Sequence, residues 1–131
     1  MTSSPRSRRL LLAAATLPVA AALALPAAPA GAAVTRCPSA DLRYPFQEGQ
    51  PNFFGVHRLR IDAGSCRTAH RVAKRWMTRF ENALSDGRVE LPRRVEGFRF
   101  KALAPSAAQT YALRGRRDGT TIRFDYVVPN G

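Results

Sequence analysis

Residues 65–87, which read SCRTAHRVAKRWMTRFENALSDG, decide the fold of this chain. Apolar side chains recur there every three or four residues, which is the spacing of one buried face of an α-helix. The members of this apolar face are Cys66, Ala69, Ala73, Trp76, Met77, Phe80 and Leu84. Ser65 stands at the N-cap position and Asp86-Gly87 suits a helix exit, so we predict one amphipathic helix between them.

The segments that flank this helix alternate apolar and polar residues, as a strand with one buried face does. Four segments are expected to be strands: residues 57–61, 98–102, 110–113 and 121–126. In the first of them, His57, Leu59 and Ile61 are expected to share the buried face. The residues 116–119 predict a turn before the last strand.

The resulting order of strand, helix, strand, strand and strand predicts an α+β fold, a small antiparallel sheet with the helix on one face. Residues 56–128 are expected to form this single domain. Residues 34–55 contain several prolines and are expected to form an irregular arm. The uncovered face of the sheet would carry basic side chains: Arg58, Arg60, Arg99, Lys101, Arg114 and Arg123.

Residues 1–30 have the features of a secretory signal peptide. A basic start precedes an apolar run over residues 10–25, and small residues follow at 28–30. We expect cleavage after residue 30, or as late as residue 33, and release of the product from the cell. The apolar run is too short and too rich in alanine for a spanning helix. Ser7-Arg8-Arg9 matches a twin-arginine signal only in part, so ordinary Sec export is favoured.

The two cysteines, Cys37 and Cys66, are expected to form a disulfide, because an exported chain meets an oxidising environment. Closing a loop of about 29 residues would stabilise the fold by about 3.5 kcal/mol. The alternative is a reactive thiolate at Cys66, near the start of the helix. No His or Asn stands at a spacing that would support such a nucleophile, so we favour the disulfide.

The chain is strongly basic, with 21 Lys and Arg against nine Asp and Glu and a net charge of +12 at pH 7. Loss of the leader would leave +9, which favours acidic partners. An alternative is a generic solvated basic surface, because 19 of the 21 basic residues are Arg, a composition typical of a GC-rich genome. Six residues are candidate anion-binding positions: Arg67, Arg71 and Lys74 on the helix, and Arg58, Arg60 and Arg123 on the sheet.

The predicted helix begins with the motif Cys66-x-x-Ala69-x-x-Val72-Ala73, and Gly97-Phe98-Arg99-Phe100 follows. Leu113-Arg114-Gly115 and Ile122-Arg123-Phe124 come later. Over about residues 56–127, these motifs resemble a family of small secreted actinobacterial proteins without an assigned function. That family has further cysteines at the positions of Phe100 and of Ala112 or Leu113, so the resemblance implies that a second disulfide is missing here. The resemblance supplies no catalytic residue.

No residue pattern in the chain indicates an active site. The only histidines, His57 and His70, have no short-range partner for a metal, and no nucleophile with a base, carboxylate pair or phosphate loop stands out. We therefore expect no catalytic residue, no metal and no cofactor.

These observations predict a small secreted, non-enzymatic binding protein that engages an anionic or acidic extracellular partner. One alternative is a binder of nucleic acid or of a cell-envelope polyanion through the arginine-rich surface. In that alternative, aromatic side chains could stack on the ligand: Phe53, Phe54, Tyr44 or Tyr111. A second alternative is an inhibitor of an extracellular enzyme. Export argues against chromosomal DNA as the target, and the partner, the oligomeric state and the biological role remain open.

Overall fold

The computed structural model of this chain describes residues 15, 33–103 and 109–129. The signal peptide expected over residues 1–30 therefore lies outside the described residues, apart from residue 15. The described strands are β1 (Val34–Arg36), β2 (Arg43–Tyr44), β3 (Phe54–Asp62), β4 (Arg94–Val95), β5 (Phe98–Ala102), β6 (Thr110–Arg117) and β7 (Thr120–Val127). A short 3-10 helix, η1 (Ala40–Leu42), and one long helix, α1 (Cys66–Ser85), complete the set.

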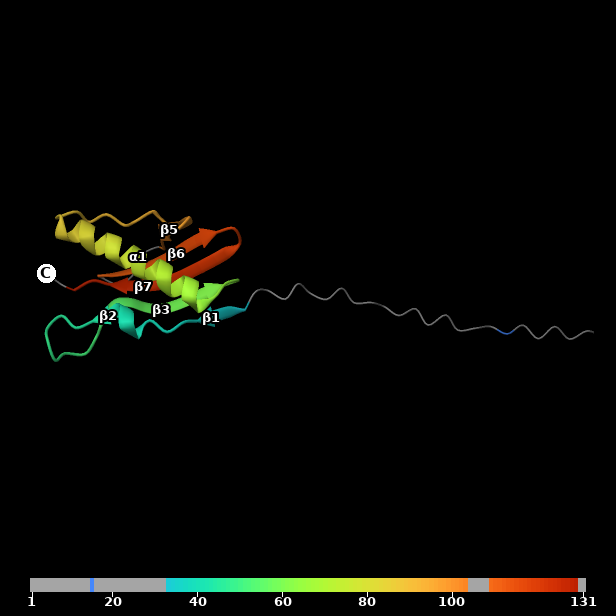
Figure 1. Cartoon of the computed structure of the whole chain (residues 1–131), viewed down its shortest axis with the longest axis horizontal. Helices are drawn as coiled ribbons and strands as arrows, with labels where there is room; N and C mark the ends of the chain where they lie inside the picture. Colours follow the sequence, from blue (N-terminus) through green and yellow to red (C-terminus); the bar gives the residue numbers. More distant parts are fainter. Residues whose placement is uncertain (1–14, 16–32, 104–108, 130–131) are drawn as a thin grey trace, which may run out of the picture.

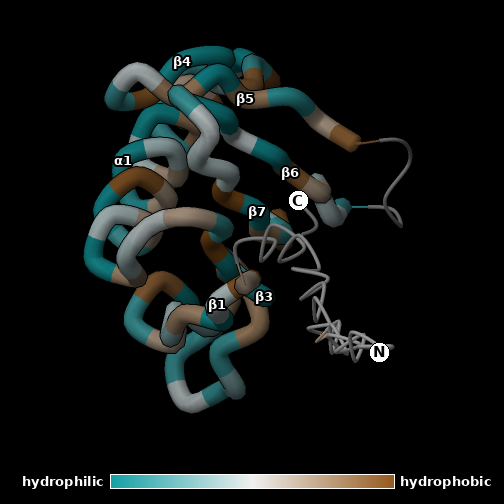
Figure 2. Tube along the Cα trace, turned by 90° about the vertical axis from the view of Figure 1, so that its right-hand side faces the viewer, coloured by the Kyte–Doolittle hydropathy of each residue, from teal (hydrophilic) through white to brown (hydrophobic). Residues whose placement is uncertain are grey.

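The strands form one antiparallel sheet with the order β1-β3-β7-β6-β5-β4, and β2 pairs with the first residues of β3. The helix α1 crosses one face of this sheet (Figure 1). Turned by 90°, the molecule shows α1 on one side and the strands on the other (Figure 2). The predicted α+β fold with one helix on an antiparallel sheet is confirmed.

The helix α1 begins and ends where its sequence predicts. The Ser65 hydroxyl oxygen accepts a hydrogen bond from the Thr68 backbone N–H at 3.2 Å, which satisfies one of the unpaired amides at the helix start. At the other end, Gly87 takes the left-handed conformation, with a φ of 74°, and its N–H donates to the Leu84 carbonyl at 2.9 Å. Both ends of the helix are therefore fixed by local hydrogen bonds.

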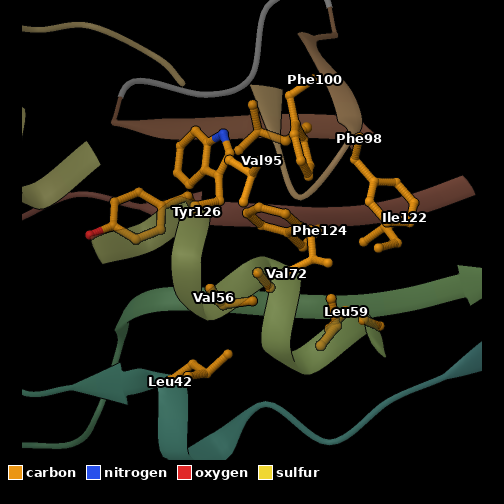
Figure 3. Packing of buried hydrophobic residues seen from close by; sticks show 14 of the residues in the cluster. Leu42, Val56, Leu59, Val72, Val95, Phe98, Phe100, Ile122, Phe124 and Tyr126 are labelled. Atoms are coloured by element: carbon orange, nitrogen blue, oxygen red, sulfur yellow. The ribbon is translucent and has the colours of Figure 1, made fainter. Parts of the chain in front are cut away.

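The core lies between α1 and the sheet, and its centre is aromatic. The fully buried Trp76 has ring centroids of Phe80, Phe124 and Tyr126 at 5.2, 5.4 and 5.4 Å. Its indole N–H donates to the Pro92 carbonyl at 3.1 Å, so its polar atom is satisfied. Figure 3 shows side chains from the sheet and from α1 meeting in this layer.

The strand β3 contains a β-bulge. Its register with β7 shifts between His57 and Arg60, so that Arg58 and Leu59 together oppose Phe124. Arg58 has a φ of 51°, the left-handed conformation that the extra residue of the bulge takes up. The alternation of faces along β3 is therefore interrupted at Arg58.

This bulge changes which residues of β3 enter the core. Val56, before the bulge, and Leu59, after it, are both buried (Figure 3). His57 instead pairs with Asp125 on the opposite face and is only half-buried. The expectation that His57 shares the buried face of Leu59 and Ile61 is therefore wrong, because the bulge shifts the alternation by one residue.

The arm, residues 34–55, contains more regular structure than its sequence predicts, since it includes β1, η1 and β2. The predicted disulfide between Cys37 and Cys66 is confirmed, with the two Cα atoms 5.2 Å apart. The Cys37 N–H also donates to the Leu59 carbonyl at 2.8 Å. The arm is thus joined both to α1 and to β3.

Close backbone contact and a polar network hold β2 in place. Gly55 has a φ of 105°, and a Cβ there would lie 2.1 Å from the Leu42 carbonyl oxygen, so only glycine permits this approach. The Tyr126 hydroxyl donates to the Glu81 carboxylate at 2.6 Å and lies 3.3 Å from the Tyr44 hydroxyl. Burial raises the pKa of Tyr126 well above its usual value, which keeps this donor protonated.

Among residues 33–103 and 109–129, no helix has the length and apolar character needed to cross a membrane.

Candidate anion-binding site

The face of the sheet opposite α1 carries a straight row of basic residues. Residues paired directly across antiparallel strands point to the same face, so the register fixes which side chains line up. One basic residue comes from each of five neighbouring strands: Arg36 on β1, Arg60 on β3, Arg123 on β7, Arg114 on β6 and Lys101 on β5. We call these five residues the basic row.

A second set of basic residues lies beside the basic row, two residues further along the strands. It joins Arg94, Arg99 and Arg116 across β4, β5 and β6. Farther across the sheet, Thr121 and Asp62 occupy the same register. The face opposite α1 therefore concentrates positive charge.

Among the described residues, the arginines that pair with carboxylates are Arg58, Arg71, Arg75 and Arg88. Arg71 and Arg75 each approach a different oxygen of Glu96 at 3.0 Å, and Arg88 pairs with Asp86 and Glu90. The hydrogen bond from Arg71 holds the pKa of Glu96 below its usual value. By contrast, within the described part of the chain no member of the basic row forms an ion pair.

The six candidate residues from the sequence fall into two groups. Arg58, Arg60 and Arg123 come together on the face opposite α1, as expected of an anion-binding surface. Arg67, Arg71 and Lys74 are exposed on α1, on the other side of the sheet (Figure 2). Arg71 is already held by Glu96. The structure thus separates the helix candidates from the sheet candidates.

A hollow of about 450 Å³ opens at the β1 end of the basic row. It forms where the arm detours away from β3 between its pairings as β1 and as β2. Four of its eight lining residues are arginines: Arg36, Arg43, Arg58 and Arg60, beside Cys37, Pro38, Ser39 and Leu59. Because Arg36 and Arg60 belong to both, the hollow and the basic row form one continuous basic surface.

Several contacts fix the walls of the hollow. The Arg58 Nε donates to Asp125 Oδ2 at 2.6 Å, and a second nitrogen of the same guanidinium contacts that oxygen. The buried Ser39 hydroxyl donates to the Val56 carbonyl at 3.0 Å, which anchors the detour of the arm. The Arg43 Nε is buried without a hydrogen-bond partner among the described residues. The Arg123 Nε of the basic row is buried in the same way.

Four residues of this surface were not among the six candidates: Lys101 and Arg114, which were expected on the uncovered face, and Arg36 and Arg43, which were not. Arg36 and Arg43 escaped the sequence analysis for a physical reason. Both lie on strands of two or three residues, which are too short to show a periodic pattern. The one available signal was the expected disulfide, because pairing Cys37 with Cys66 brings the arm to the end of β3. Arg36 precedes that cysteine directly.

This arrangement is suited to binding anions. Guanidinium groups keep their charge at all ordinary pH values, and their planar forks match phosphate and carboxylate oxygens. Within the described ranges, no group of three or more His, Cys, Asp or Glu side chains could hold a metal ion. Comparisons of the chain with protein-family models, with curated proteins and with solved structures found no match.

Proposed function

We propose that this protein is exported, carries no catalytic activity and binds a linear polyanion outside the cell through the basic row. The observation that carries the proposal is that five aligned basic residues on five strands lack ion pairs in the described structure. An anionic partner would supply the missing counter-charges. The leader-like sequence over residues 1–30 and the disulfide support the extracellular setting.

The like charges of the basic row are costly without a partner. Basic residues placed directly opposite one another on neighbouring strands repel each other and destabilise the sheet. A composition rich in arginine would not by itself align basic residues in register across five strands. Local features that oppose stability tend to occur at functional sites.

The geometry of the basic row favours an extended polymer as its partner. Neighbouring strands lie about 4.8 Å apart, so the five charges span about 19 Å in a gently twisted line. A chain with a negative charge every few ångströms can follow this line and contact each basic side chain in turn. A compact small anion would contact only one or two of them.

Binding to a labelled linear polyphosphate tests the proposal, with fluorescence anisotropy recorded at several salt concentrations. Five contacts predict a slope of log K against log salt of about −3.5, which is a roughly 100-fold loss of affinity between about 50 and 200 mM salt. The double variant Lys101→Gln with Arg114→Gln removes two members of the row and should make the slope shallower, at about −2.

A matched control removes the same charge from the other side of the molecule. The double variant Arg67→Gln with Lys74→Gln changes two exposed residues of α1 and should keep the slope of the unaltered protein. Equal losses in the two double variants would contradict the proposal, because they would show that only net charge matters. Affinity that does not change with salt would also contradict it and would point to an acidic protein partner with an apolar contact.

A further inference from the structure

The hollow at the β1 end of the basic row differs in character from the row itself. Its arginines converge from three strands, with Arg36 on β1, Arg43 on β2, and Arg58 and Arg60 on β3. The row is a line along a surface, whereas the hollow is a concave site of about 450 Å³, within the range of pockets that hold small ligands. A discrete chemical group therefore suits the hollow better than a segment of polymer does.

The charge within the hollow indicates the charge of that group. Its eight lining residues include no carboxylate. The nearest negative charge is that of Asp125, which forms an ion pair with Arg58. The guanidiniums of Arg36, Arg43 and Arg60 form no ion pair with any described residue. About three uncompensated positive charges favour a dianion over a monoanion.

The number of arginines around the hollow favours a tetrahedral group. A carboxylate has two oxygens in one plane, so it can be held by one or two guanidinium forks. A phosphate monoester presents three oxygens in different directions and carries close to two negative charges at neutral pH. Arginines that line the hollow from three strands can each bind a different oxygen.

We propose that the hollow is a phosphate-monoester site that receives a terminal phosphate group. The placement of that group at the end of a polymer lying along the basic row rests on the function proposed above. The binding of a monoester in the hollow does not, because only Arg36 and Arg60 belong to both surfaces. A free phosphate monoester and a polymer terminus share this chemistry.

Isothermal titration calorimetry on the disulfide-bonded protein, at one ionic strength set with sodium chloride, tests this proposal. The probes are inorganic phosphate, glycerol 3-phosphate and dimethyl phosphate, a monoanionic diester. We expect the first two to bind at pH 7.5 and the diester to bind at least tenfold more weakly. The affinity for glycerol 3-phosphate should fall about tenfold from pH 7.5 to pH 5, because the second pKa of phosphate esters is about 6.

Variants at Arg43 localise the site. Arg43→Gln should weaken glycerol 3-phosphate binding at least tenfold, and Arg43→Lys should also weaken it, because lysine keeps the charge but loses the planar fork. Arg36→Gln, an exposed position on an edge strand, provides a second test should Arg43→Gln fail to fold. The matched control is Lys74→Gln, which removes one charge from the exposed side of α1, outside the hollow and the basic row, and should leave monoester binding unchanged.

Equal affinity for the monoester and the diester would overturn the proposal, as would unchanged binding in folded Arg43→Gln. Equal weakening by Lys74→Gln would overturn it too, since it would show attraction to the net charge alone. These results would leave the function of the basic row standing if polyphosphate still showed its salt slope. Monoester binding without any polyphosphate binding would instead contradict the function proposed for the basic row and support the monoester site in the hollow.

Discussion

Loss of the Cys37–Cys66 disulfide should lower the stability of the whole domain and abolish the hollow. The bond joins residues separated by 29 positions. On the chain-entropy estimate, closing a loop of this length raises the free energy of the unfolded chain, and so stabilises the folded protein, by about 3.6 kcal/mol. For a domain of this size, such a loss lowers the melting temperature by roughly 15–25 °C.

The structure also indicates which part of the protein responds first. Without the disulfide, the arm would still be held by the Cys37 N–H bond to Leu59, by the Ser39 hydroxyl bond to Val56 and by the short pairings of β1 and β2. The core around Trp76 does not depend on the bond, since it lies between α1 and strands β5 to β7. We therefore expect a folded but weakened domain with a loosened arm.

Urea unfolding of the variant Cys37→Ala with Cys66→Ala measures the loss, with the fluorescence of the single tryptophan, Trp76, as the probe. Amide hydrogen exchange should quicken first in residues 34–44. Monoester binding in the hollow should weaken, while polyphosphate still binds the four residues of the basic row that lie outside the arm. The unaltered protein under reducing conditions should behave in the same way, and reductant should have no effect on the variant. A loss below about 1 kcal/mol would refute the reasoning, because the disulfide would then not restrict the unfolded chain as the estimate requires.

Two further changes test the ion-pair cluster and the polar network. Glu96→Gln should destabilise the protein by about 1 kcal/mol at pH 7, because it removes two partly exposed ion pairs. Since the folded pKa of Glu96 is lowered, that stabilisation is present above its ordinary pKa of 4.5 and is lost as the pH falls through the folded value. The difference in urea unfolding between Glu96→Gln and the unaltered protein should therefore shrink from pH 7 to pH 3, and an equal difference at both pH values would contradict this. Tyr126→Phe should cost about 1 kcal/mol by removing the hydroxyl that donates to Glu81. Thermal unfolding of this variant beside Tyr111→Phe provides the control, because the Tyr111 hydroxyl forms no hydrogen bond to a described residue, and equal losses would count against the network.

The sequence predicts the elements with strong periodicity. The helix α1 is found at the predicted position because its apolar spacing, its Ser65 cap and its Gly87 exit all agree. The strand predicted over residues 98–102 coincides with β5, and the turn at 116–119 contains Asp118 and Gly119, both with positive φ. Such two-residue turns match the twist of the strands they join. These features depend only on neighbouring residues.

The remaining features depend on contacts between distant segments. β1, β2 and β4 have two or three residues each, so their pairing rather than their composition makes them strands. The bulge at Arg58 decides that Arg60 lies opposite Arg123, since an unbroken alternation from His57 would turn Arg60 toward the core. The sequence therefore predicts that the open face is basic but not that five charges align across it.

The two faces of the sheet have opposite energetic roles. Four neighbouring pairs of like charges in the basic row would each cost a fraction of a kcal/mol, roughly 1–4 kcal/mol in total. The aromatic core around Trp76 lies on the other face, and the disulfide adds a stabilisation of similar size to that cost. A small domain can therefore remain folded with unneutralised arginines on one face, provided that the other face and the arm are secured. The hollow, with four arginines among its lining residues, is walled by the same short arm that the disulfide holds, so its stability depends on that bond.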